Sequence, residues 1–187
     1  MGTLRLVPHP DSPPLAVSGI EAAIIGLDAN WLRLRWRVEG SARVLIPPFA
    51  GKGRTDGLWR QTCFELFLKS PDEDGYVELN LSPSERWAAY DFAAYRAGME
   101  DRAVPRDPDC TIRLGGNMLI FDAAIPVAAL PPLPWRIGLS AVIEEAGEGG
   151  EDEPPVKSFW ALRHAPGAPD FHSPACFAAA LAAPANP

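Results

Sequence analysis

The chain has 187 residues, a length that suits one domain whose hydrophobic core is large enough to need no disulfide and no structural metal. Its formal net charge of -7 argues against nucleic acid and against an anionic membrane surface as partners, because both attract basic patches, and it leaves sugars, cations and neutral ligands open. The three cysteines include no CxxC spacing, which fits reduced thiols better than a disulfide framework or a structural zinc site.

Residues 1–14 form a lead-in that prolines interrupt before any continuous apolar segment develops. A start of this kind indicates neither a secretory signal nor a membrane span, so we expect a cytoplasmic protein. Residues 20–27 and 31–38 are predicted to form a hairpin. In its second arm, apolar residues alternate with three arginines at every second position. That alternation predicts one face on the core and one charged face.

A short strand is predicted at residues 43–46, and residues 49–57 are predicted to form a surface loop. The most informative segment comes next. Residues 63–69 and 76–82 alternate between apolar and polar side chains, and the residues between them are turn formers. An antiparallel hairpin is therefore predicted, and pairing Lys69 with Tyr76 fixes its register.

In this register one face of the hairpin is uniformly apolar and must pack on the core. That face carries Phe64, Leu66 and Leu68 opposite Leu81, Leu79 and Val77. The other face carries Cys63, Glu65 and Phe67 opposite Ser82, Asn80 and Glu78, with Glu65 diagonal to Glu78. A solvated surface explains these polar residues as well as a functional site does, because antiparallel sheets often expose one side. The aromatic Phe67 in the middle of this face favours the functional interpretation.

Further strands are predicted at residues 86–92, 110–114, 117–125, 136–143 and 156–163, with a long loop at 95–109 and an acidic, glycine-rich loop at 144–153. In the first of these strands Ala88, Tyr90 and Phe92 face the core, unless a one-residue slip exchanges the faces and brings Arg86 to the polar side. The composition of residues 173–181 favours a helix with Ser173 as its N-cap. Many strands separated by turn residues, with no long amphipathic helix, predict an antiparallel β-sandwich.

Four stretches of the chain carry a family resemblance. They read LW…CFELFL (58–68), YVELNLSPS (76–84), WAAY (87–90) and FWALRH…PG…PDFH (159–172). In this order they resemble the DOMON-like superfamily and, within it, the bacterial branch allied to type-nine carbohydrate-binding modules. The resemblance spans residues 15–182, which sets 1–14 apart as a lead-in and 183–187 as a tail. It implies an immunoglobulin-like or jelly-roll-like β-sandwich whose concave face binds a sugar or haem, depending on the branch, and a final strand at 177–181 in place of the helix.

In the sugar-binding branch, two tryptophans clamp the sugar ring while charged and amide side chains hydrogen-bond its hydroxyls. Trp59, six residues before Glu65, matches the first clamp and its acidic partner, and Trp160 resembles the second clamp. The physics suits these residue types, because the axial C–H groups of a sugar stack on an aromatic face and its hydroxyls need fixed donors and acceptors. The candidate acceptors are Glu65, Glu78 and Asn80, and the candidate donors are Arg86 and Lys157. For both tryptophans a place in the core is the alternative.

Other chemistries find less support in the sequence. Haem would need an axial pair such as Met99 and His164, but a lone histidine in a loop is seldom a ligand, so we expect no haem and no other cofactor. Glu65 and Glu78 could form the acid and nucleophile of a glycosidase, yet nothing in the chain marks either carboxyl for a raised pKa. The acidic residues 72–74 are predicted to form a solvated turn and not a metal site. The sequence therefore predicts a non-catalytic module that binds a mono- or oligosaccharide, with an intracellular scaffold using the same face as the alternative.

Overall fold

The computed structural model describes residues 2–147 and 153–183. Within these ranges the fold is all-β and its helices are single 3-10 turns. The strands are β1 (Leu4–Pro8), β2 (Gly19–Leu27), β3 (Trp31–Glu39), β4 (Gly53–Arg54), β5 (Cys63–Lys69), β6 (Tyr76–Leu81), β7 (Arg86–Phe92), β8 (Glu100–Asp101), β9 (Asp109–Leu114), β10 (Met118–Pro126), β11 (Trp135–Glu145), β12 (Val156–Ala161) and β13 (Ala179–Leu181). The 3-10 turns are η1 (Ser41–Arg43), η2 (Leu58–Arg60), η3 (Val127–Ala129) and η4 (Pro174–Cys176). Among the described residues, no helix is long and apolar enough to cross a membrane.

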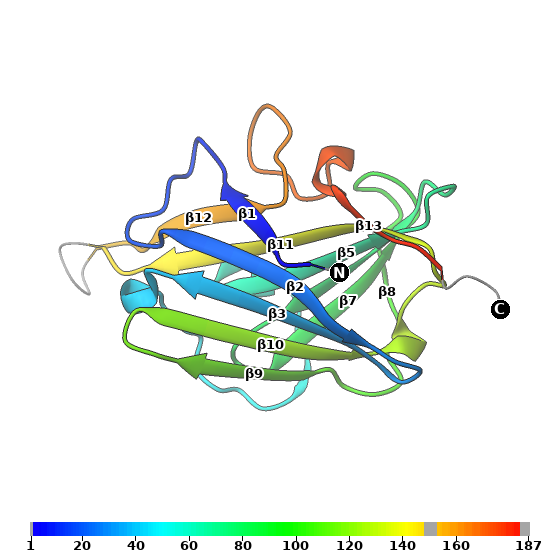
Figure 1. The fold of residues 1–187 in the computed structure, drawn as a ribbon, viewed down its shortest axis with the longest axis horizontal. Helices are drawn as coiled ribbons and strands as arrows, with labels where there is room; N and C mark the ends of the chain where they lie inside the picture. The colour runs from blue at the N-terminus through cyan, green and yellow to red at the C-terminus, as the bar shows by residue number, and fades with distance from the viewer. Residues whose placement is uncertain (1, 148–152, 184–187) are drawn as a thin grey trace.

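The strands form one continuous sheet that curls back on itself (Figure 1). Its order is β4-β7-β6-β5-β11-β12-β1-β2-β3-β10-β9, with β8 beside β7 and β13 beside β11. β1 joins the two halves, because residues 4–6 pair with β2 while residues 7 and 8 pair with β12. The β4–β7 pair is parallel, so the sheet is mixed. The expected all-β class is confirmed, but the strands curl as one mixed sheet into a half-barrel, where we had predicted an antiparallel sandwich.

The hydrophobic core lies inside the curl, between β2, β3 and β10 on one side and β5, β6, β7 and β11 on the other. Trp36, Phe64 and Phe121 meet there with no exposed surface, and the rings of Phe64 and Phe121 stack with their centroids 4.4 Å apart. The alternation in β3 explains this arrangement, since its apolar residues point inward and its arginines outward. On the outward side Arg35 makes two hydrogen bonds to the carboxylate of Asp122.

Both predicted hairpins are confirmed. The central one, β5–β6, has the predicted register, with Leu66 opposite Leu79 and Glu65 opposite Asn80. In the next strand, β7, the one-residue slip is the arrangement observed. Trp87 and Ala89 lie in the core, and Ala88, Tyr90 and Phe92 lie on the other side with Arg86. The cause is the pairing with β6, which places Ala89 opposite the buried Leu79 and thereby fixes the direction of every second residue.

Three predicted segments differ from the structure, and the open choice between a helix and a final strand at the C-terminus is resolved. The loops predicted at 49–57 and 95–109 contain the two-residue strands β4 and β8. Residues 43–46 form no strand; the chain instead leaves η1 and makes an isolated bridge between Val44 and Glu145. The helix that the composition of residues 173–181 favours is a single 3-10 turn, η4, in which the Ser173 hydroxyl accepts a hydrogen bond from the Ala175 amide. The chain then extends as β13 against β11, as the family resemblance implied. Hydrogen-bonding groups at the edge of β11 thus outweigh the helical propensity of the alanines.

The structure also describes the N-terminal lead-in, part of the predicted acidic loop, and the turn between β5 and β6. The lead-in of residues 1–14 contains β1, whose pairing with β2 and β12 joins the two halves of the sheet. Of the predicted loop at 144–153, the first two residues belong to β11, and residues 148–152 lie outside the described part of the chain. The acidic residues 72–74 are exposed in the turn between β5 and β6, as predicted.

Candidate ligand-binding surface

The polar face predicted from the sequence is the side of β5, β6, β7 and β11 that points away from the core; we call it the outer face. Register brings its residues together, because Glu65 lies opposite Asn80 on one neighbouring strand and opposite Ser140 on the other. Glu78 lies opposite Phe67 and Tyr90. The structure therefore places three of the predicted site residues, Glu65, Glu78 and Asn80, in one group.

This outer face is neither solvated nor open. The turn η2 lies against β5, β6 and β7, and the segment 171–177 packs across the aromatic residues of the face. Phe177 meets Phe67 edge-on with ring centroids 6.0 Å apart, and His172 meets it at 5.4 Å. As a result the exposed fractions of Glu65 and Glu78 are 2% and 6%. Neither interpretation weighed from the sequence anticipated a second, partly aromatic core on this side.

The buried polar groups make hydrogen bonds in two sets, one around Glu65 and one around Glu78. Ser140 Oγ donates to Glu65 Oε2 at 3.1 Å, and Asn80 Nδ2 donates to Glu78 Oε1 at 2.8 Å. His172 Nε2 lies 3.7 Å from Glu78 Oε2, and the Tyr76 hydroxyl lies 2.8 Å from His172 Nδ1. Such partners lower the cost of burying polar groups in a site of low dielectric constant.

Burial decides the charge of these groups. It raises the pKa of Glu65 well above the usual value, and the nearby carboxylate of Glu78 raises it further, while the hydrogen bond from Ser140 opposes the shift. Burial also raises the pKa of Glu78 to about 7, against the hydrogen bond from Asn80 and the charge of Arg96. The pKa of His172 is lowered to about 4 by burial and then by Arg96, so at neutral pH its ring is neutral and its contact with Glu78 is not an ion pair. Burial of the two adjacent carboxyl groups thus shifts the pKa of each toward the protonated form.

Trp59 lies above the outer face on η2, and half of its surface is exposed. Its neighbour Leu58 packs on the aromatic cluster below, and the Arg60 guanidinium sits 5.6 Å from the centroid of the Trp59 ring. Lys157 holds this turn from β12, since its ammonium group donates to the Arg60 carbonyl at 2.5 Å and lies 3.3 Å from Glu144. The ring is thus presented to solvent on an anchored turn.

Arg86 is occupied in a similar way, because its guanidinium donates to the carbonyl of Ala50 at 2.5 Å and so holds the loop of residues 49–57. Both candidate donors, Arg86 and Lys157, therefore fasten the segments that surround Trp59.

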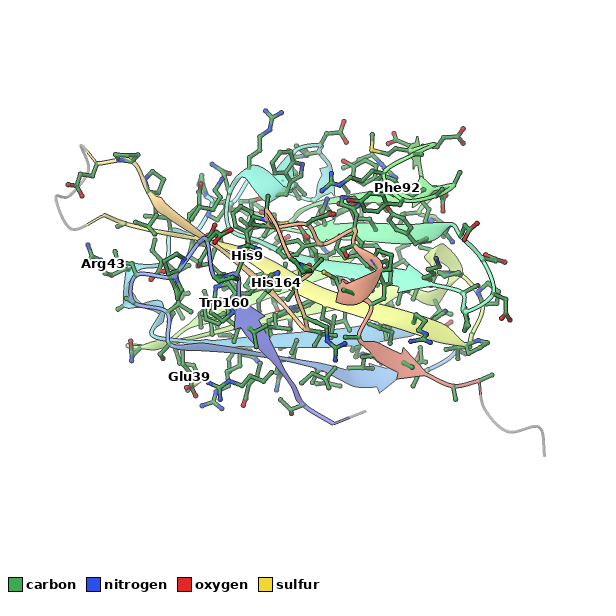
Figure 2. The ribbon with its side chains drawn as sticks, turned by 90° about the horizontal axis from the view of Figure 1, so that it is seen from above. His9, Glu39, Arg43, Phe92, Trp160 and His164 are labelled. Atoms are coloured by element: carbon green, nitrogen blue, oxygen red, sulfur yellow. The ribbon has the colours of Figure 1, made fainter. Side chains whose placement is uncertain are left out.

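Trp160 lies elsewhere. It points into the core from β12, opposite Ala141, with 3% of its surface exposed, and its indole donates to Ser158 Oγ at 2.9 Å. Figure 2 shows Trp160 between the two halves of the curled sheet and Phe92 on the outer side of β7. A clamp needs an exposed ring, and β12 turns this one away from Trp59 and Glu65. Trp160 therefore lies in the core, which was the alternative to a clamp for both tryptophans.

The two residues considered for haem are held in unrelated surroundings. Met99 is exposed in a loop, whereas His164 Nε2 lies 2.9 Å from the Val7 carbonyl, and its ring packs edge-on against His9. Among the residues that the structure describes, no group of three or more histidine, cysteine or acidic side chains could hold a metal ion.

Sequence reasoning missed the residues that complete the buried network, namely Tyr76, Ser140 and His172. Tyr76 lies two residues before Glu78 in β6, and Ser140 lies opposite Glu65, so both share the outer face with these carboxyl groups. Extending the predicted strand pairing would have placed them there. His172 carried no signal, because it comes from a loop that only the tertiary fold brings to Glu78.

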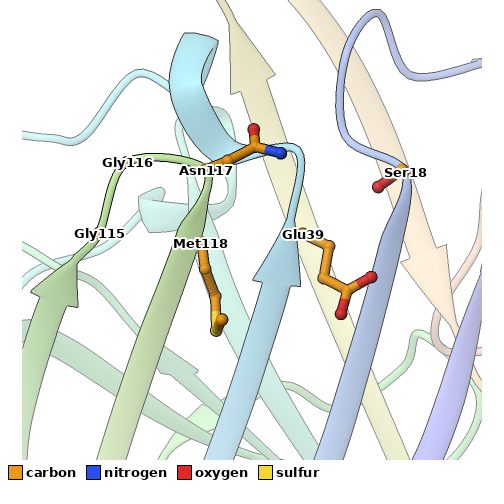
Figure 3. A pocket seen from close by; sticks show the side chains of 6 residues that line it. All are labelled: Ser18, Glu39, Gly115, Gly116, Asn117 and Met118. Carbon is orange, nitrogen blue, oxygen red and sulfur yellow. The ribbon is translucent and has the colours of Figure 1, made fainter.

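The structure also has a shallow hollow on its other half, at the ends of β2, β3 and β10 (Figure 3). It measures about 430 Å³ and is bordered by Ser18, Glu39, Asn117 and Met118 and by two glycines. Its one carboxylate, Glu39, already pairs with Arg37 at 2.6 Å. This hollow therefore offers little with which to hold a ligand.

Comparison with protein-family models finds no match, and neither does comparison with curated protein sequences. Among solved structures, the chain is similar to a candidate carbohydrate-binding protein from Bacteroides uniformis, with a TM-score of 0.58, 16% sequence identity, and coverage of 94% of this chain and 83% of that one. Two structures of a family 9 carbohydrate-binding module from Caldicellulosiruptor kristjanssonii, one with glucose and one with cellotriose, each give a TM-score of 0.42. Their identities are 14% and 12%, with 80% and 84% of this chain and 69% and 72% of theirs covered. The similarity to the Bacteroides protein shows a shared fold.

Proposed function

We propose that this protein is a non-catalytic carbohydrate-binding module whose ligand stacks on Trp59. One observation carries the proposal. Of the six tryptophans, Trp59 is the one with a largely exposed ring: four others are at most 5% exposed, and Trp31 is partly covered by Arg106. A large aromatic side chain held in water by an anchored turn gains little for the fold and suits a flat, partly apolar ligand.

The surroundings of Trp59 fit a sugar in particular. Its ring can cover the axial C–H groups of a pyranose, while the Arg60 guanidinium and the exposed amide of Gln61 are donors and acceptors for hydroxyls at the ring's edge. In this proposal Lys157 and Arg86 act by holding the backbone of the turn and of the adjoining loop. Glu65, Glu78 and Asn80 act from below by fixing the sheet on which η2 rests.

The fold agrees with this proposal, since a protein of similar fold is a candidate for carbohydrate binding. We further propose that the curled sheet is a variant of the DOMON-like β-sandwich, allied to type-nine modules, and that the protein acts in the cytoplasm. A glycosidase is disfavoured because the carboxyl groups of Glu65 and Glu78 are covered by η2 and by residues 171–177, where a polysaccharide chain cannot reach them.

The proposal is tested on a glycan array with the wild-type protein, Trp59→Ala and Trp31→Ala. Trp31 is a matched control, because it is a second partly exposed tryptophan on the far half of the sheet, at the start of β3. We expect wild type and Trp31→Ala to bind the same glycans and Trp59→Ala to bind none of them. Equal binding by all three proteins would contradict the assignment of Trp59. If the folded wild type binds no glycan, the scaffold alternative is the better one.

A further inference from the structure

A second hollow opens at the other end of the central hairpin, beside the turn between β5 and β6. It measures about 270 Å³ and is bordered by Lys69, Asp74, Tyr76, Tyr95, His172 and Phe177, among others. The strand β5 separates it from Trp59: Cys63 at one end and Lys69 at the other are about 20 Å apart along an extended chain. The hollow is therefore a different place from the proposed Trp59 site.

The inner wall of this hollow consists of aromatic rings that pack on one another. Tyr76 stacks on Phe92 with ring centroids 4.8 Å apart, and Phe177 meets Tyr76 edge-on at 5.6 Å. His172 offers no free nitrogen, because one ring nitrogen faces the Tyr76 hydroxyl and the other faces Glu78. These groups therefore shape the hollow and are not placed for acid–base catalysis on a ligand.

The outer wall is the half-exposed ring of Tyr95. Its hydroxyl donates to Asp170, which also accepts a hydrogen bond from the Arg96 guanidinium at 2.7 Å. Tyr95 is thus held by its hydroxyl while about half of its surface remains exposed. An exposed aromatic ring fixed by a hydrogen bond is a suitable platform for a small ligand.

At the mouth of the hollow, Lys69 and Asp74 differ from most charged groups of this sheet. Neither side chain makes a hydrogen bond or an ion pair with any other described residue, whereas Arg96 and Asp170 nearby are paired. The hollow therefore presents one unpaired ammonium group, one unpaired carboxylate and an aromatic wall. Charges of opposite sign disfavour both a simple anion and a simple cation.

We propose that this hollow is a second saccharide site, which takes a neutral sugar unit of monosaccharide size. A hydroxyl both donates and accepts, so neighbouring hydroxyls of one sugar can donate to Asp74 and accept from Lys69 at the same time. The C–H face of the same ring then lies on Tyr95. The volume of about 270 Å³ lies just below the usual range for pockets of drug-sized ligands, about 300 to 1,000 Å³, and therefore suits a single sugar unit. The inference rests on the proposed function for the nature of the ligand, but on none of the residues around Trp59.

The test follows amide chemical shifts by NMR while glucose, galactose, mannose or xylose is added to the full-length protein. The variants are Trp59→Ala, Asp74→Ala and Tyr95→Ala, with Glu73→Ala as the matched control because it is an exposed carboxylate of the same turn outside the hollow. We expect Trp59→Ala to retain binding, with shifts at residues 94 and 95, and we expect Asp74→Ala and Tyr95→Ala to weaken that binding at least tenfold. Glu73→Ala should behave as wild type.

The outcomes separate the two proposals. If Trp59→Ala removes all binding and Asp74→Ala changes nothing, the Trp59 site stands and the second site is refuted. If Asp74→Ala removes all binding and Trp59→Ala changes nothing, the second site stands and the first is refuted. Free phenylalanine is titrated in the same way. Its binding in this hollow, with no shift from any sugar, would refute the second site by showing that the two charges select a zwitterion. Thermal unfolding of each variant establishes that it is folded.

Discussion

The side chains of Glu78 and His172 meet beneath the C-terminal segment, with His172 Nε2 3.7 Å from Glu78 Oε2. Glu78 belongs to the central hairpin, whereas His172 belongs to the segment that crosses the outer face. This contact attaches the covering segment to the sheet through two groups whose pKa values burial shifts toward the uncharged form, to about 7 for Glu78 and to about 4 for His172. Closure of the outer face and the protonation of Glu78 are thus linked.

The stability of the protein should therefore fall as the pH rises through neutrality. In the fold the pKa of Glu78 is raised to about 7, whereas its ordinary value is 4.5, so between these values the folded state holds a proton that the unfolded state has lost. The free energy of unfolding then decreases with pH across this window. His172 acts in the opposite direction between about 4 and 6.5, because its pKa is lowered in the fold. The effect of Glu78 is therefore clearest above about pH 6.5.

Glu78→Gln isolates this effect, because the amide oxygen can still accept from Asn80 but carries no charge. We expect urea unfolding to show a smaller loss of stability between about pH 6.5 and about pH 8 in the variant than in the wild type. Asp72→Asn, in the exposed turn, is the control and should leave the pH dependence unchanged. Parallel curves for Glu78→Gln and wild type would contradict a pKa of about 7 for Glu78 in the folded protein.

Truncation of a side chain on the core face of the central hairpin should strongly lower the free energy of unfolding. Leu66 is fully buried, so Leu66→Ala should lower the free energy of unfolding by about 2 to 5 kcal/mol. Leu114→Ala, at an exposed position of β9, should change it by at most about 0.5 kcal/mol. Chemical denaturation measures both values. A loss for Leu66→Ala as small as that for Leu114→Ala would mean that the register of β5 is wrong.

The two tryptophans proposed from the sequence as clamps should differ in what they stabilise. Trp160→Ala removes a buried core ring and should cost about 3 to 5 kcal/mol of unfolding free energy. Trp59→Ala removes a half-exposed ring and should cost less than about 1 kcal/mol. Thermal and urea unfolding distinguish these cases. Equal destabilisation by the two substitutions would place Trp59 in the core as well.

Haem binding is expected to be absent, because Met99 and His164 are held in separate surroundings and His164 Nε2 already faces the Val7 carbonyl. Purified protein titrated with haemin should show no Soret band beyond that of free haemin. A stoichiometric low-spin spectrum that disappears in His164→Ala would overturn this expectation.

The sequence was sufficient to predict the register of the β5–β6 hairpin, because a turn of defined length and a period-two pattern leave one pairing that keeps Leu66 and Leu79 on the same side. The same reasoning placed Glu65 near Asn80 and Glu78. It could not predict what covers them, because η2 and residues 171–177 reach the outer face through tertiary packing that no local pattern records. For this reason it missed both His172 and the raised pKa of Glu78.

Trp59 and Trp160 show a second limit of prediction from the sequence. Both were predicted as clamps from a resemblance in sequence order, but a resemblance of this kind does not state which way a side chain points. The pairing of β12 with β11 turns Trp160 inward, and only the assembled sheet contains that information. In β7, likewise, two registers fitted the pattern equally, and the choice came from pairing with β6.

The measurement that tests the account most directly is a calorimetric titration of the wild-type protein and of Trp59→Ala with mono- and oligosaccharides. For a shallow surface site we expect wild-type dissociation constants between millimolar and micromolar, or about -4 to -8 kcal/mol. Trp59→Ala should lose this binding while its melting temperature stays close to that of the wild type, and Trp59→Phe should retain part of it because an aromatic face remains. Undiminished affinity in a folded Trp59→Ala would contradict the claim that the exposed ring of Trp59 is where this protein holds its ligand.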